Sequence, residues 1–380
     1  MRGIEEELEA IRQQGLWRKL TPYPQTGSQP GQGMQQFASN DYLGLAHHPA
    51  ITEAFQEGLR LHGHGAAASR LVCGTSPAHL ALEAAIAARK GAARALTFST
   101  GYAAAMGTIP ALVGKSDFII VDKLSHACLI DAAKLSGATM RVFPHNHMGK
   151  LKNLLESIRA QNGGKPRILI ITESIFSMDG DLAPLREIVA LKQSYDAWLL
   201  VDEAHGFGVM GHHGGGLAEE WGLQQEIELQ MGTLSKAAGL AGGFIAGSSA
   251  LIALLINRAR SFIYSTAPPP ALAHAALRSV ELIGSAEGRA LRERLQSNVR
   301  ILHEAPAPAL LTPIIPVILG SNETALQASA RLAEAGFVVP AIRYPTVPRN
   351  SARLRISVSA AHEEASLLAL RDQLKRLSSS

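Results

Sequence analysis

Cysteine is scarce in this chain: Cys73 and Cys128 are the only two in 380 residues, and they form no CxxC pair. This scarcity favours a reducing compartment over a disulfide framework. The sequence also lacks an apolar run long enough to span a bilayer, and its first residues are rich in glutamate where a secretory signal has a basic and then an apolar region. We therefore expect a soluble, cytoplasmic protein with no membrane partner.

Dense basic runs are missing as well. The formal net charge is only +4, and no lysine or arginine cluster is interleaved with aromatic residues, so a nucleic-acid partner is not expected. Asp202, Glu203 and His205 lie close together, but the other histidines show no partnering ligand spacing, so we expect no metal site. A GxGxxG motif after an early strand is absent, which argues against a nucleotide-binding oxidoreductase.

What the chain does contain is an alternation of short apolar runs with helical stretches. Hydrophobic residues make up 47% of the sequence, enough for a substantial core. The alternation predicts an α/β fold with a mostly parallel sheet covered on both faces, followed by a smaller α+β domain that begins with a long helical stretch at 271–302. We expect strands at 94–99, 118–122, 168–172, 198–202 and 243–247, an N-terminal helix and arm at 1–45 with a Pro/Gly/Gln-rich arm at 21–36, a large domain at 46–270 and a small C-terminal domain at 271–380.

A lysine among glycines and hydroxyls is the strongest chemical candidate. Lys236 lies in the octapeptide 232–239 (GTLSKAAG), with Thr233 and Ser235 on either side. Such a lysine suits a group that must lose its proton and bond covalently to a carbonyl, while the hydroxyls and backbone hold an anion nearby. Our hypothesis is a lysine that binds pyridoxal phosphate (PLP). The alternative is a surface lysine in a glycine loop.

Two candidates follow the expected strand at 198–202. Asp202 ends the strand, where a carboxylate can hold a pyridine nitrogen in its protonated form. A turn former or helix cap is the alternative for an aspartate there. His205 follows three residues later in a glycine-bounded turn and can donate to the phenolic oxygen of the cofactor. The alternative for His205 is a partly exposed histidine.

Other candidates lie just past expected strands. Gly101 and Tyr102 open a helix, and backbone N–H groups at a helix start favour phosphate. His126 is placed to stack on a flat ring, although a helix-cap or core histidine is the simpler interpretation. Glu173 is positioned to reach the cofactor region, and Ser177 offers a hydroxyl.

Arg353 and Arg355 lie two residues apart near the C-terminus. In a strand they share one face, while Leu354 and Ile356 face the core. One arginine suits bidentate capture of a substrate carboxylate. The alternative is a pair of surface arginines on an edge strand.

Taken jointly, the ordered motifs at 39–45 (SNDYLGL), 172–181 (TESIFSMDGD), 202–206 (DEAHG) and 233–236 (TLSK) resemble the α-oxoamine synthases. That family has the aspartate aminotransferase-like, fold-type I architecture of PLP-dependent transferases. The resemblance implies that Lys236 is the Schiff-base lysine, Asp202 the pyridinium partner, His205 the donor to the phenolic oxygen and His126 the ring-stacking residue, which also contacts substrate.

The resemblance also implies roles for residues that lie outside these motifs or carry little signal alone. Family members are homodimers with shared active sites, so Ser265 and Thr266 are expected to reach the phosphate of the neighbouring subunit. Arg355 is our choice for the amino-acid carboxylate, and Arg18 and Thr346 match positions of substrate contact. The residues expected to position the cofactor, largely around its phosphate, are Gly101, Tyr102, Ser177 and Thr233.

The segment 341–355 most resembles the biotin-pathway member of the family. That member condenses L-alanine with a pimeloyl thioester of CoA or of acyl-carrier protein. The alternatives are a glycine-using member, such as 2-amino-3-ketobutyrate ligase or 5-aminolevulinate synthase, and a non-catalytic partner subunit. Two departures concern the site: alanines occupy 103–105, where an asparagine is usual, and 66–68, where relatives often have more glycine.

Overall fold

The computed structural model describes residues 3–20, 22, 33–161, 166–303 and 310–378. Its residues form two compact units, one from 39–314 and 357–367 and a smaller one from 1–38, 315–356 and 368–380. Residues 271–314 belong to the larger unit, whereas we expected them in the small C-terminal domain. The domain boundaries that we expect from the sequence stay a prediction. The expected arm at 21–36 lies largely outside the described residues.

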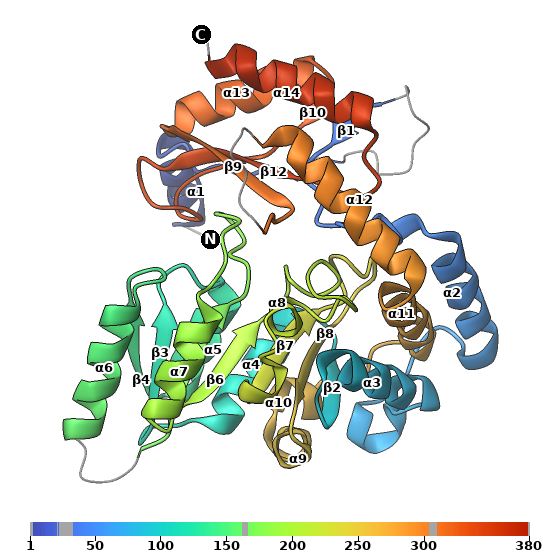
Figure 1. Ribbon diagram of the computed structural model, residues 1–380, viewed down its shortest axis with the longest axis vertical. Helices are drawn as coiled ribbons and strands as arrows, with labels where there is room; N and C mark the ends of the chain where they lie inside the picture. Colours follow the sequence, from blue (N-terminus) through green and yellow to red (C-terminus); the bar gives the residue numbers. More distant parts are fainter. Residues whose placement is uncertain (1–2, 21, 23–32, 162–165, 304–309, 379–380) are drawn as a thin grey trace. The chain divides into compact units, whose positions relative to one another are not determined.

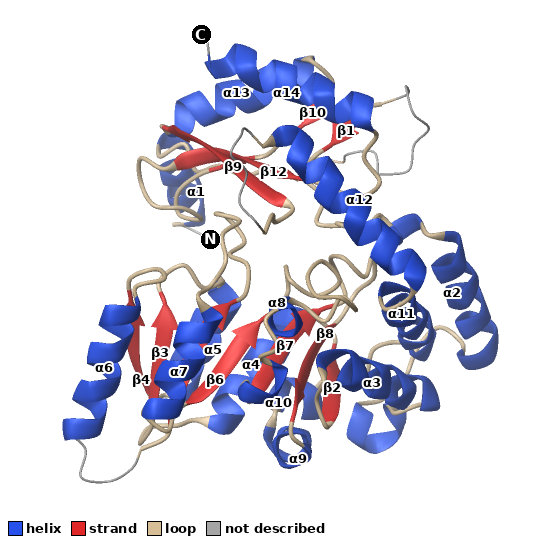
Figure 2. Ribbon diagram, in the orientation of Figure 1, coloured by secondary structure: helices blue, strands red, loops and turns tan. Residues whose placement is uncertain are grey.

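A seven-stranded sheet forms the centre of the larger unit (Figures 1 and 2). Its strands in spatial order are β2 (Arg94–Phe98), β8 (Gly243–Gly247), β7 (Leu229–Thr233), β6 (Trp198–Asp202), β5 (Ile168–Glu173), β3 (Phe118–Asp122) and β4 (Thr139–Phe143). Strand β8 is antiparallel to both of its neighbours, and all other pairings are parallel. The prediction of a mostly parallel sheet is therefore confirmed.

Helices cover both faces of this sheet because successive strand residues point to opposite faces. Ile119 and Val121 of β3 belong to one hydrophobic cluster, and Ile120 belongs to the other. The first cluster includes residues of α4 (Gly101–Leu112), α5 (Ala127–Ser136), α9 (Ser249–Arg258) and α10 (Arg260–Ile263). The second includes residues of α6 (Met148–Gln161), α7 (Leu185–Ser194) and α8 (Leu217–Glu220). Burial on both faces explains the near-continuous apolar strands.

Further helices of the larger unit pack beside β2. Helix α11 (Pro270–Ile283) packs on α2 (Pro49–His62) and α3 (Pro77–Lys90). The single helical stretch expected at 271–302 is wrong: α11 ends at Ile283 and α12 (Ala286–Leu302) starts anew. The hydroxyl of Ser285 caps the second helix by accepting from the Gly288 amide at 3.2 Å.

The smaller unit has the α+β composition expected for the C-terminal domain. A three-stranded sheet runs in the order β11 (Ala341–Ile342), β12 (Ala352–Ser357) and β9 (Ile314–Gly320). A second pair joins β1 (Gln35–Gln36) to β10 (Phe337–Val338) in parallel. The helices are α1 (Ile4–Gln13), α13 (Asn322–Glu334) and α14 (Glu364–Ser378). Among the described residues, none of the helices is both long and apolar enough to cross a bilayer.

Candidate active site

Polar groups gather at the carboxyl ends of the central strands. Strand β5 ends at Glu173, β6 at Asp202 and β7 at Thr233. The strand register pairs Glu173 with Asp202, and Asp202 with Met231 of β7, so the ends lie side by side. Glu173, Asp202 and Thr233 are all buried. Parallel sheets of this kind bind ligands at this edge.

A cavity of about 230 Å³ lies at this edge. It brings together eight of the residues predicted from the sequence: Gly101, Tyr102, His126, Glu173, Asp202, His205, Thr233 and Lys236. The lining is completed by Thr100, Cys128, Ala204, Met231 and Ser235. Chemistry-bearing groups from the ends of β5, β6 and β7 and from the starts of α4 and α5 therefore share one space.

Lys236 is half-buried and lines this cavity. Its Nζ lies 2.8 Å from His205 Nε2. The loop that carries it is folded by Thr233, whose hydroxyl donates to the Gly242 carbonyl at 2.8 Å and lies 2.7 Å from the Ser235 hydroxyl. Lys236 is therefore held at the end of β7 against an imidazole instead of extending from a glycine loop into solvent.

Two neighbouring carboxyls lie at the base of the cavity. Burial, together with the charge of Asp202, raises the pKa of Glu173 to about 8. Burial also raises the pKa of Asp202, against the opposing charge of Lys236. Asp202 accepts the Ala204 amide at 2.9 Å, and Glu173 accepts the His126 amide at 2.5 Å. The Glu173 carboxyl therefore keeps its proton near neutral pH and limits the repulsion between the pair.

His126 caps helix α5 and lines the cavity at the same time. Its Nδ1 accepts the Cys128 amide at 3.2 Å and lies 3.0 Å from the Cys128 thiol. Burial lowers the pKa of His126, with the charge of Lys236 acting in the same direction and that of Asp202 against it. The helix-cap interpretation is therefore correct, and the residue still faces the space predicted for the cofactor.

The start of α4 supplies an anion-binding edge to the cavity. Thr100 caps this 12-residue helix by accepting the Ala103 amide at 3.0 Å, which leaves Gly101 and Tyr102 at its first positions. The Tyr102 hydroxyl donates to Asp131 at 2.8 Å. N–H groups at such a helix start favour phosphate.

Three predicted residues of the larger unit do not line the cavity. Ser177 is buried, and its amide bonds to Glu173. Ser265 and Thr266 lie on a segment that is held against Ala68 and Ser69 by a β-bridge and by the Ala267 amide, which donates to the Ala68 carbonyl at 2.9 Å.

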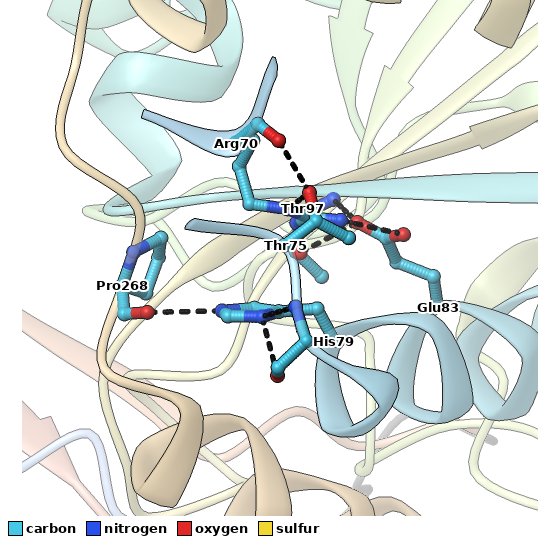
Figure 3. A network of polar contacts seen from close by, with 7 residues as sticks. Arg70, Thr75, His79, Glu83, Thr97 and Pro268 are labelled. Atoms are coloured by element: carbon cyan, nitrogen blue, oxygen red, sulfur yellow. Dashed lines mark hydrogen bonds and ion pairs between the residues drawn. The ribbon is translucent and has the colours of Figure 1, made fainter. Parts of the chain in front are cut away.

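A network of buried polar contacts fixes that segment (Figure 3). His79 Nε2 bonds to the Pro268 carbonyl at 2.9 Å. Arg70 pairs with Glu83 through two contacts of 2.9 and 3.1 Å, and both side chains also bond to the Thr97 hydroxyl. The network ties the turn at 70–74 to helix α3 and strand β2, next to Ser265 and Thr266.

The substrate residues predicted from the resemblance, Arg18, Thr346 and Arg355, belong to the smaller unit. Arg353 and Arg355 are buried in β12, the central strand of its sheet. The alternative of surface arginines on an edge strand is therefore wrong. Leu354 and Ile356 are buried as well, so β12 is covered on both faces instead of one.

Sequence reasoning missed Tyr42 and Cys128. The Tyr42 hydroxyl lies 2.6 Å from His205 Nδ1 across 163 positions of sequence and donates to Asn40 Oδ1 at 3.0 Å. Tyr42 belongs to the motif at 39–45, so that motif was the signal for it. Cys128 is the second residue of α5, one of the positions whose amide a helix-capping side chain bonds.

The comparisons with known proteins agree with this geometry. The chain matches the family model for aminotransferase class I and II over residues 33–374. An 8-amino-7-oxononanoate synthase of Geobacter sulfurreducens is 46% identical over 376 residues, which cover 96% of this chain and 95% of that protein.

Solved structures share the fold. A serine palmitoyltransferase variant of S. paucimobilis, solved with a bound PLP–myriocin aldimine, is 28% identical with a TM-score of 0.89, covering 100% of this chain and 97% of that chain. The 8-amino-7-oxononanoate synthase of Francisella tularensis is 27% identical with a TM-score of 0.76, covering 91% of this chain and 97% of that chain.

The fold is that of the fold-type I PLP-dependent transferases, as predicted. The chain belongs to the aminotransferase class I and II family and, within it, to the 8-amino-7-oxononanoate synthases. The resemblance to the biotin-pathway member of the α-oxoamine synthases is thereby confirmed.

Proposed function

We propose that this protein catalyses the decarboxylative condensation of L-alanine with a pimeloyl thioester, which gives 8-amino-7-oxononanoate, carbon dioxide and the free thiol carrier. The observation that carries the proposal is one cavity that holds Lys236, His205 and the buried Asp202, in a chain 46% identical to a named synthase of this product. The carrier is CoA or acyl-carrier protein, and either one presents the pimeloyl group as a thioester.

The lining of the cavity fits PLP. The Lys236 amine suits attachment to an aldehyde, and the buried Asp202 carboxylate suits a pyridinium nitrogen. The start of α4 and the exposed hydroxyl of Ser235 suit a phosphate, and Thr233 shapes the loop beside them. When bound, PLP supplies an electron sink for negative charge on the carbon next to the amino group.

The residues around that cofactor have distinct tasks. The charge of Lys236 favours the ionised form of Asp202, which would hold the proton of the pyridine nitrogen. Lys236 Nζ, once free, takes the α-proton of L-alanine as a general base. His126, which lines the cavity, would cover the flat ring of the cofactor. Arg355 holds the amino-acid carboxylate in a bidentate contact, and Arg18 and Thr346 contact substrate.

We also propose a homodimer with shared active sites, in which Ser265 and Thr266 reach the phosphate bound by the partner subunit. The support is that both residues lie outside the cavity of their own chain, on a segment fixed by the Arg70–Glu83 network. The cytoplasmic location expected from the sequence stays a prediction.

Product identification by mass spectrometry tests the proposed reaction. The protein is incubated with alanine or glycine, each combined with pimeloyl-CoA, acetyl-CoA or succinyl-CoA. Serine with palmitoyl-CoA is tested as well, because a serine palmitoyltransferase shares the fold. Only alanine with pimeloyl-CoA should give 8-amino-7-oxononanoate efficiently. A glycine product with acetyl-CoA or succinyl-CoA would assign the chain to a glycine-using member. A colourless protein without any product would favour the non-catalytic subunit.

A further inference from the structure

The two histidines of the cavity differ in what their Nδ1 atoms contact. A neutral imidazole carries one proton, on Nδ1 or on Nε2, and the partner of one nitrogen fixes the role of the other. His126 Nδ1 faces a backbone amide, whereas His205 Nδ1 faces the hydroxyl of Tyr42. Counting donors around each ring therefore assigns its tautomer.

His126 is the simpler case. The Cys128 amide can only donate, and it points at Nδ1 from 3.2 Å, so Nδ1 carries a lone pair and the ring proton lies on Nε2. Burial raises the pKa of the Cys128 thiol, so the sulfur 3.0 Å away is a donor as well. The charged groups that act on this ring from the surrounding elements are Asp131, Asp202 and Lys236, and Glu173 bonds to the backbone amide of His126.

His205 is held in the opposite way. Tyr42 is fully buried, and its only proton is donated to Asn40 Oδ1 at 3.0 Å. The short contact of 2.6 Å between the Tyr42 oxygen and His205 Nδ1 therefore takes its proton from Nδ1. The lone pair of Nε2 then faces Lys236 Nζ at 2.8 Å, and the lysine donates.

We propose that Tyr42 is a positioning residue that fixes His205 as the Nδ1–H tautomer, so that His205 Nε2 accepts a proton from Lys236 Nζ. In this step a proton moves from the Lys236 ammonium to His205 Nε2, which gives a neutral amine and an imidazolium. A neutral amine is the form that bonds to a carbonyl or takes an α-proton. The inference rests on the proposed function of Lys236.

The order of events follows from this tautomer. His205 was expected to donate to the phenolic oxygen of the cofactor, and in the Nδ1–H tautomer Nε2 has no proton to give. It gains one from Lys236 and becomes a donor only afterwards. Tyr42 thus couples the release of the lysine proton to the donor role of His205.

Nitrogen NMR of the histidine rings tests the assignment directly. Full-length protein with ¹⁵N-labelled histidine is measured as purified and after removal of the cofactor, and His126→Asn and His205→Asn assign the two rings. We expect a protonated Nδ1 on His205 and an unprotonated Nδ1 on His126. An unprotonated Nδ1 on His205 would overturn the proposal.

Three variants separate the contribution of Tyr42. Tyr42→Phe removes the acceptor for Nδ1–H, so the ring of His205 should shift toward Nε2–H while His126 is unchanged. Asn40→Leu frees the Tyr42 proton for Nδ1 and should shift the ring in the same direction. Asn40→Asp keeps an acceptor for the Tyr42 hydroxyl and should retain the wild-type tautomer.

Activity supplies the second readout. Tyr42→Phe should lower kcat by about threefold to tenfold, the effect of one neutral hydrogen bond of about 1 kcal/mol, and change KM little. Tyr195→Phe is the matched control, because its hydroxyl contacts Glu156 on the exposed surface. Unchanged His205 signals in Tyr42→Phe and Asn40→Leu would refute the inference. The NMR measurement needs no substrate, so its outcome is independent of the outcome of the product assay.

Discussion

His145 forms a charged clamp between two segments that carry site residues. Its Nδ1 lies 3.0 Å from Asp122 and its Nε2 lies 2.7 Å from Asp181. Asp122 ends β3 just before the turn of His126, and Asp181 belongs to the segment of Ser177. We predict that His145→Gln, which removes the charge and one N–H donor, destabilises the protein.

The magnitude follows from the unequal burial of the two carboxylates. Asp181 is 44% exposed, so its contact is worth less than about 1 kcal/mol. The Asp122 side chain is fully buried, where a hydrogen bond to a charged group contributes about 1.5–3 kcal/mol. Asp122 keeps the amides of Leu124 and Asn146 in the variant, at 2.8 and 2.9 Å. We therefore expect a loss of about 2–3 kcal/mol in the free energy of unfolding.

The raised pKa of His145 determines how its contribution to stability changes with pH. Burial alone would lower the pKa of His145, but the hydrogen bonds and charges of Asp122 and Asp181 outweigh burial and raise it to about 10, from an ordinary 6.5. A raised pKa means that the folded state binds the proton more tightly. The stabilisation is therefore fully present below pH 6.5 and is lost as the pH rises through 10.

Denaturant unfolding of wild type and His145→Gln, measured in steps from pH 6 to 10, checks both points. The difference in unfolding free energy should be largest at the acid end and shrink steadily toward the alkaline end. Asp181→Asn is the control and should cost less than about 1 kcal/mol. A difference that stays constant across this range would refute the charged clamp.

Two further predictions concern buried contacts near the site. Arg70→Met should cost about 3–5 kcal/mol in denaturant unfolding because it leaves the Glu83 carboxylate without its buried partner, and the double variant with Glu83→Met should recover much of that loss. Gly206→Ala places a Cβ atom 2.1 Å from Glu203 Oε2 and should destabilise the fold by about 1–3 kcal/mol and lower product formation through the neighbouring His205. Gly65→Ala, with nothing within 4 Å of its Cβ position, should do neither, and an equal loss in both glycine variants would contradict the argument.

The sequence predicted β2, β3, β5, β6 and β8 of the central sheet from their short apolar runs. The expected strands 118–122, 198–202 and 243–247 have the bounds observed for β3, β6 and β8. Strands β4 and β7 went unrecognised. Strand β4 lies at the edge of the sheet and has two exposed residues, whereas β7 is buried inside the sheet but Gln230, Gly232 and Thr233 interrupt its apolar run. A hydrophobic pattern therefore reveals strands with a near-continuous apolar run, and it misses strands whose run is interrupted by polar residues or glycine.

The candidate site was predictable where a residue directly follows a strand or opens a helix. Asp202 and Gly101 were found in this way, because parallel strands end at one edge of the sheet. Tyr42 could not be placed, since its contact with His205 depends on the path of a distant segment. The turn at 70–74 that fixes the segment of Ser265 also depends on tertiary contacts.

Lys236 is the residue that we propose to bind the cofactor. Borohydride reduction of the PLP-loaded protein, followed by peptide mapping, measures the attachment point directly. We expect one modified peptide that contains Lys236. It should be lost in Lys236→Ala, together with turnover, and retained in Lys123→Ala, whose lysine is exposed beside the site. A label on another lysine of the wild-type protein would contradict this assignment. So would a Lys236→Ala variant that kept both the label and turnover.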